Sequence, residues 1–253
     1  MNISMSTRIT GRFLILAFAL VLCPALVAWA DSAPADKSPA PPLLMLAQMQ
    51  PTHPEHILMI FDKIAGIEPD FAALAGKSPF LNKAKEVDRD SIINRENNRL
   101  RQTWADLDSS QPIVVHTSVN LANYSTINEQ LTLPEFNPKT FFSFAIYGEN
   151  IAIVPKDIAR FSKIPLTRQQ MDEILKKTTS TAATAELILK PAVADAKTPF
   201  VHDGKSYWLM LAEIGEIRLW AGKEGDAQLL WMHRADWYKP KEDTSLLNLK
   251  SGM

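Results

Sequence analysis

The chain has 253 residues, of which 46% are hydrophobic and 22% are charged, a composition typical of an ordinary globular protein. Its 27 basic and 28 acidic residues nearly cancel, to a net charge of −1. Because nucleic acids and anionic membranes attract proteins with a basic excess, we expect no nucleic-acid partner and no binding to anionic lipid.

Residues 1–30 have the three parts of a secretory signal peptide. Two arginines precede a short apolar run at residues 13–22, and Ala28-Trp29-Ala30 supplies the small residues that a signal peptidase accepts. We predict cleavage after Ala30 and a periplasmic or secreted protein. A membrane span needs about 20 apolar residues, more than this run supplies. The alternative is an uncleaved signal that anchors a structural or assembly factor.

Cleavage after Ala30 would change the chemistry open to the protein. It would remove Cys23, the only cysteine, so the mature chain would have no disulfide, thiolate ligand or cysteine nucleophile. A lipoprotein that uses Cys23 is disfavoured, because the bulky Leu22 precedes it. The mature chain would carry 25 basic and 28 acidic residues. We expect it to have no stable membrane span.

The next segments are a Pro/Ala-rich linker and a helical part. Residues 31–42 lack large apolar side chains, which is typical of a spacer. Within the helical part, residues 43–110, one helix is predicted from Pro54 to a stop at Gly66, and a short one over 69–75. A longer helix follows. Its apolar stripe consists of Ile93, Leu100, Trp104 and Leu107, and its charged run over 94–101 is interpreted as a solvated face.

Strand patterns begin after Ser110 and define a sheet part over 111–240. Strands are predicted at 113–119 and 131–133, and a hairpin with alternating Phe142, Phe144 and Ile146 and a turn at 148–150. One inserted helix interrupts the strands, where Thr167 and Gln170 form a capping-box pattern.

The C-terminal part is predicted as an antiparallel meander. Its strands are expected at 185–190, 206–214, 216–221 and 227–234. An Asp203-Gly204 turn and a break at Gly215 separate the strands, and a tail covers 241–253. Strand 206–214 is apolar on both faces, so we expect it to be central and covered on both sides. The fold class is α+β, with N-terminal helices packed on a mainly antiparallel β-sheet.

The five histidines supply the only candidates for a metal or catalytic site. His53 and His56 could share a helix face as metal ligands, but Pro54 at a helix start explains the local sequence more simply. His116, His202 and His233 lie on or beside predicted strands, where each could meet a carboxylate as a general base. Half-buried or surface histidines are the simpler interpretation for these three.

Known catalytic and cofactor motifs are missing from the sequence. It has no Gly-x-Ser-x-Gly elbow, no Walker loop and no dinucleotide-binding loop, so we expect no cofactor. Four tryptophans crowd the C-terminal part, and core packing is the favoured explanation. Trp220 and Trp237 are the candidates for an exposed binding surface, since Trp220 shares a strand face with Glu216 and Arg218.

The stretch 94–104, followed by Leu121-Ala122-Asn123-Tyr124 and by residues 131–136, resembles an uncharacterised family of secreted bacterial proteins. That resemblance implies a bacterial envelope setting and no particular activity or site residue.

From these features we expect a non-enzymatic binding protein of the periplasm, whose sheet surface contacts an envelope protein, a peptide or a glycan. The alternative is a hydrolase of the cell envelope that uses histidine and a carboxylate. That alternative requires at least two histidines to share a pocket with a carboxylate.

Overall fold

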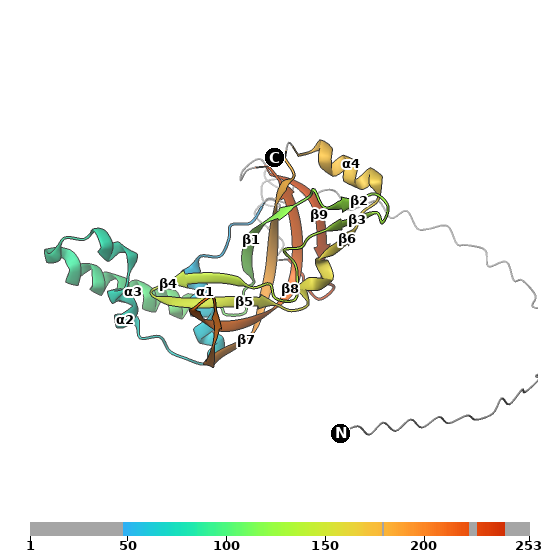
Figure 1. Cartoon of the computed structure of the whole chain (residues 1–253). Coiled ribbons are helices and arrows are strands. Elements are labelled where there is room, and N and C mark those ends of the chain that lie inside the picture. The colour runs from blue at the N-terminus through green and yellow to red at the C-terminus, as the bar shows by residue number, and fades with distance from the viewer. Residues whose placement is uncertain (1–47, 179, 223–226, 241–253) are drawn as a thin grey trace, which may run out of the picture. The chain divides into compact units, whose positions relative to one another are not determined.

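A computed structural model describes residues 48–178, 180–222 and 227–240. They form an α+β fold of helices and a mainly antiparallel sheet (Figure 1), as the sequence predicted. The predicted signal peptide, the 31–42 linker and the 241–253 tail lie outside the described residues. Among the described helices, none has the length and apolar character needed to cross a bilayer.

Helix α1, Pro54–Ala65, confirms the predicted first helix. The His53 side chain accepts a hydrogen bond from the Glu55 N–H at the start of the helix, and Gly66 ends it in the left-handed region, with φ +71°. Five consecutive residues, 57–61, are buried. Since they point to every side of the helix, α1 lies inside the fold, where it contacts β4, β5 and β7.

Helices α2, Phe71–Gly76, and α3, Arg89–Asp106, lie side by side (Figure 1). Two short 3₁₀ turns connect them, η1 (Pro79–Lys83) and η2 (Glu86–Asp88). The predicted apolar stripe of α3 is confirmed: Leu100 is buried, and the other members pack against the core. The charged run is largely solvated, as interpreted, but Glu96 within it is buried.

The main sheet has the strand order β1-β7-β8-β5-β4, and β9 also pairs with β8. All of these pairs are antiparallel except β5 with β8. The strands are β1 (Ile113–Asn120), β4 (Phe142–Ile146), β5 (Glu149–Pro155), β7 (Ala182–His202), β8 (Lys205–Ala221) and β9 (Gln228–Arg234).

The β7–β8 hairpin is much longer than predicted, with strands of 21 and 17 residues. The predicted turn at Asp203-Gly204 is confirmed, since both residues have positive φ, +48° and +73°. The predicted break at Gly215 was wrong. Ile188 pairs with Glu216 and Leu189 with Ile214, so Gly215 is the extra residue of a β-bulge inside one continuous strand.

The β4–β5 hairpin is confirmed, but its turn lies at Tyr147-Gly148, one residue before the predicted position. A second, three-stranded sheet contains β2 (Tyr124–Ser125), β3 (Gln130–Thr132) and β6 (Lys163–Pro165). The 3₁₀ turn η3 (Ile158–Phe161) and helix α4 (Arg168–Lys176) flank β6. Helix α4 begins with the predicted capping box of Thr167 and Gln170.

The main sheet has two faces, because side chains alternate along each strand. The helix-covered face contributes Leu187, Ile217 and Ile153 to an apolar core shared with α1. The opposite face carries Glu186, Arg218 and other residues outside that core. Strand β8 is central, as predicted, between β7 and β5. We expected both faces of this strand to be covered. That expectation was wrong for the N-terminal half of β8, where Leu211 on the opposite face is 47% exposed.

Candidate functional site

Four charged side chains and one histidine form a row across four strands on the opposite face of the main sheet. The strand register places His116 of β1 beside Glu186 of β7, and Glu186 beside Arg218 of β8. One step along, Glu216 of β8 pairs with Arg234 of β9. We call these five residues the charged network. Glu186 and Glu216 are completely buried and Arg218 is 3% exposed, so the centre of the network is shielded from water, whereas its two ends, His116 and Arg234, are partly exposed.

Each buried charge in the network meets an opposite charge. Arg218 Nη1 donates to Glu186 Oε1 at 2.9 Å, and Arg218 Nε donates to Glu216 Oε1 at 2.7 Å. Arg234 Nε donates to Glu216 Oε2 at 3.1 Å. A buried charge without a partner would reduce the free energy of unfolding by several kcal/mol, roughly the loss measured when a buried ion pair is broken in other proteins. The two carboxylates and two guanidiniums therefore form a neutral, mutually satisfied set.

The pKa of Arg218 reflects this balance. Burial acts to lower the pKa of its guanidinium, but the hydrogen bonds and negative charges of Glu216 and Glu186 outweigh burial and raise it. Arg218 therefore stays charged at any physiological pH.

Tyr238 covers the network at the Gly215 bulge. A Cβ atom at position 215 would lie 2.8 Å from the Tyr238 ring, closer than real contacts allow, so only glycine leaves room for the ring. The pKa of Tyr238 is raised, first by burial and then by the charge of Glu216. The bulge thus lets the chain after β9 pack on this face.

His116 is oriented by the network. Its Nε2 atom lies 3.3 Å from Glu186 Oε2, which also accepts a hydrogen bond from the Met49 N–H at 2.7 Å. A carboxylate can only accept, so Nε2 carries the proton of this contact, and Nδ1 is the atom of the neutral ring that can accept a hydrogen bond. The ring is held in the way that an orienting carboxylate holds a functional histidine.

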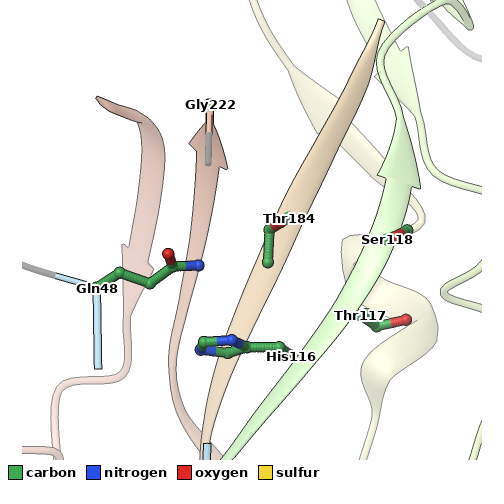
Figure 2. Close-up of a pocket in the computed structure, with 6 residues that line it drawn as sticks. All are labelled: Gln48, His116, Thr117, Ser118, Thr184 and Gly222. Carbon is green, nitrogen blue, oxygen red and sulfur yellow. The ribbon is translucent and has the colours of Figure 1, made fainter. Parts of the chain in front are cut away.

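A pocket of about 260 Å³ opens beside this histidine. Gln48 and His116 reach toward the same space from opposite sides, next to Thr184 of β7 (Figure 2). The residues that line the pocket are Gln48, His116, Thr117, Ser118, Thr184 and Gly222. None of these described lining residues is Lys, Arg, Asp or Glu, and together they present hydroxyl, amide and imidazole groups to the pocket. These groups can bind a polar ligand, and no metal or cofactor ligand set is among them.

A second polar cluster joins α1 and α3 to the β4–β5 turn. Arg99 donates two hydrogen bonds to Glu55, at 2.7 and 2.6 Å, and contacts Glu96 at 3.0 Å, while the Tyr147 hydroxyl also donates to Glu55. Burial alone would raise the pKa of Glu55, but the hydrogen bonds from Arg99 and Tyr147 and the charge of Arg99 lower it overall. This bidentate geometry fastens α3 to the body of the protein.

The three strand histidines lie in different surroundings. His116 faces the pocket. His233 instead pairs in register with Ile217 of the helix-covered face, and the centroid of its ring lies 4.8 Å from the centroid of the Phe161 ring. His202 lies at the β7–β8 turn, stacked with Phe200 and 3.4 Å from Asp203. Each thus has a different neighbour, and His116 is the one whose carboxylate partner is buried.

The two histidines proposed as metal ligands flank the start of α1. The ring centroids of His53 and His56 are 6.4 Å apart, and His53 is used as the helix cap. In the part of the chain that the structure describes, no three His, Cys, Asp or Glu residues gather as a metal site would require.

Of the two candidate surface tryptophans, Trp220 is corrected by the structure. It shares a face with Glu216 and Arg218 as predicted, but it is only 1% exposed, because that face is itself buried around it. Its indole N–H has no hydrogen-bond partner among the described residues. Trp237 is 45% exposed, and its ring lies 5.5 Å from Lys190 Nζ.

The residues that surround His116 were not predicted from the sequence. Glu186 is the single charge in the apolar run 185–189, and a lone charge in a buried strand signals a paired or functional group. The alternation of Glu216, Arg218 and Trp220 was visible too. No sequence pattern indicated that Gln48 and Thr184 would line a pocket, because only the tertiary structure brings these two residues together.

The chain matches no family model, no curated protein and no solved structure.

Proposed function

We propose that the protein is exported, with cleavage after Ala30, and acts in the periplasm or outside the cell as a non-enzymatic binding protein. Its binding site is the pocket lined by His116 and Thr184. The observation that carries the proposal is the charged network behind this pocket, which holds the His116 ring through a completely buried carboxylate. A polar pocket with an oriented side chain favours recognition, since a pre-ordered group loses little entropy when a ligand binds.

The predicted partner classes remain an envelope protein, a peptide or a glycan. Titration with soluble glycans and with peptides from an envelope digest, followed by NMR of the backbone amides, tests the site directly. We expect shifts to concentrate on β1 and β7 around Ser118 and Thr184. Ser143, an exposed serine on β4, provides the matched control position. Shifts that cluster around Ser143, or none around Thr184, would contradict this site.

Export is tested separately by mass spectrometry of the N-terminus of the protein isolated from cells. Asp31 as the first residue is the expected result. A chain that still begins at Met1 would favour the anchored alternative.

A second candidate function is hydrolysis with a single histidine, which the His116–Glu186 contact favours specifically. The two histidines that the sequence-based alternative required at one pocket are not found here, because His116 is the one histidine among the described lining residues. A carboxylate that orients one imidazole nitrogen leaves the other able to take a proton from water. This candidate predicts that the His116→Gln variant loses activity on ester or glycoside substrates. Binding without turnover, by a wild-type protein incubated with its ligand, would contradict the hydrolase and support the binding protein.

A further inference from the structure

We infer that the pocket takes an uncharged, hydroxyl-bearing ligand of monosaccharide size. This inference rests on the proposed function, since it names the ligand class of the same site. Three properties of the pocket lead to it: the charge of its surroundings, the hydrogen-bonding groups on its walls, and its volume.

The first property is that the charged groups behind the pocket are already engaged with each other. Glu186 is bound by Arg218, by the Met49 N–H and by His116, and Glu216 is bound by two arginines. A charged ligand would lose part of its hydration on entering and would meet no opposite formal charge on the described lining residues, because none of these is Lys, Arg, Asp or Glu. An uncharged ligand avoids this desolvation cost.

The second property is the mixture of donors and acceptors on the walls. Thr184 and Ser118 contribute hydroxyls, which both donate and accept, and the Gln48 amide has one group of each kind. His116, with its Nε2 proton directed at Glu186, adds an acceptor in its neutral form. Sugar hydroxyls also donate and accept at each oxygen, so they match these walls better than an apolar ligand.

The third property is size. At about 260 Å³, the pocket lies below the range of about 300–1,000 Å³ typical of drug-sized ligands. It has room for one sugar ring and excludes a folded chain. A longer glycan would therefore place a single unit here and extend outward past the exposed Ser118.

The experiment compares sugars that differ in charge but share a ring. Glucose, galactose and N-acetylglucosamine are the neutral probes, glucosamine is the cationic probe and glucuronate the anionic probe, each titrated at pH 7 and followed by amide NMR. We expect at least one neutral sugar to bind saturably at the pocket, at least fivefold more tightly than either charged sugar. Equal or tighter binding of a charged sugar, or no saturable shift with any neutral sugar, overturns the inference.

Two variants link the binding to the pocket. Thr184→Val and Gln48→Leu remove hydrogen-bonding groups at nearly constant volume, and each should weaken the neutral sugar about tenfold, whereas the Ser143→Ala control should not. Unchanged circular dichroism confirms that the variants fold. If another ligand from the envelope digest binds and Thr184→Val weakens it, the proposed function stands and the sugar inference fails. If neither variant weakens any ligand, both fail.

Discussion

The two faces of the main sheet are both buried near its centre, but they are buried by different chemistry. Leu187 and Glu186 are neighbours on β7, point to opposite faces, and are both completely buried. Leu187 contacts the apolar core beneath α1, where burial removes hydrocarbon from water. Glu186 lies in the charged network, where burial is tolerated because each charge has a partner.

This contrast shows that the alternation of polar and apolar residues along a strand separates two faces of the sheet but does not tell which face is exposed to solvent. A polar residue at every second position is usually the solvent side of a half-buried sheet. Here Glu186, Glu216 and Arg218 on the polar side are buried as well. Their burial is tolerated because the strand register places opposite charges beside each other. If the two faces stabilise the fold in different ways, substitutions on each face should change the free energy of unfolding differently.

The largest effect is expected for Arg218→Met. This change leaves Glu186 without its guanidinium partner and Glu216 with only Arg234. Breaking a buried ion pair typically costs about 3–5 kcal/mol, and we expect a loss of that size in the free energy of unfolding, measured by urea denaturation. Arg95→Met, on the exposed side of α3, is the control and should stay within about 0.5 kcal/mol. Equal losses in the two variants would show that the network adds no stability.

A comparable or somewhat smaller loss is expected for Leu187→Ala on the helix-covered face. Truncation of a buried leucine leaves a cavity and typically costs about 2–5 kcal/mol. The matched control, Val201→Ala on the same strand, removes methyl groups from a side chain that is largely exposed, so it should cost less than about 0.5 kcal/mol. Thermal or urea denaturation checks both. A Leu187→Ala loss as small as the control's would refute the assignment of this face to the core.

Asp62→Asn in α1 is expected to increase the free energy of unfolding, by an amount intermediate among these predictions. Burial, and then the negative charge of Glu149, raise the pKa of Asp62 from its ordinary 3.8 to about 7. Between about pH 4 and pH 7 the folded protein therefore holds a proton that the unfolded chain has released, and stability falls as the pH rises through this window. The asparagine variant should be more stable by about 1–2 kcal/mol above pH 7, after allowance for partial exposure, and equal to wild type near pH 4.

Urea denaturation at several pH values checks this prediction for Asp62. Parallel stability profiles of the two proteins between pH 4 and pH 8 would contradict it. The result sharpens the contrast between the faces, because Asp62 is a carboxyl group with Glu149 as its charged neighbour, whereas Glu186 has Arg218.

The smallest effect is expected for Lys77→Met. Its ion pair with Glu149 spans 3.7 Å, and both side chains are more than a third exposed. Exposed pairs contribute about 0–1 kcal/mol, so the urea midpoint should barely move. A loss as large as that of Arg218→Met would mean that burial is not what distinguishes the charged network.

Local features of the fold followed closely from the sequence. Pro54 and Gly66 bounded α1, Thr167 and Gln170 capped α4, and Asp203-Gly204 formed the long hairpin turn. These signals are local, because caps and turns depend on the φ angles and hydrogen bonds of a few consecutive residues. The predicted strand break at Gly215 was wrong because it, too, relied on local sequence alone. A glycine that interrupts a strand locally indicates a turn, whereas here it makes a bulge that receives Tyr238.

The candidate site could be predicted only in part. His116 was a candidate from its place in a strand, and the shared face of Glu216, Arg218 and Trp220 followed from alternation. Their burial did not follow, and neither did the contact of His116 with Glu186, which lies 70 residues further along the chain. Trp220 was expected at the surface because its neighbours Glu216 and Arg218 are charged, but all three residues are buried, and the two charges are paired.

The sequence by itself determined the α+β class, the helix ends and the hairpin turns, because each is governed by side chains close together in the chain. It also supports the prediction of an exported protein. The tertiary structure alone decided that Glu186, Arg218, Glu216 and Arg234 form one neutral network and that Gln48 and Thr184 meet His116 at a pocket. The physical reason is that charge pairing across strands depends on register, and register is fixed only when the whole sheet assembles.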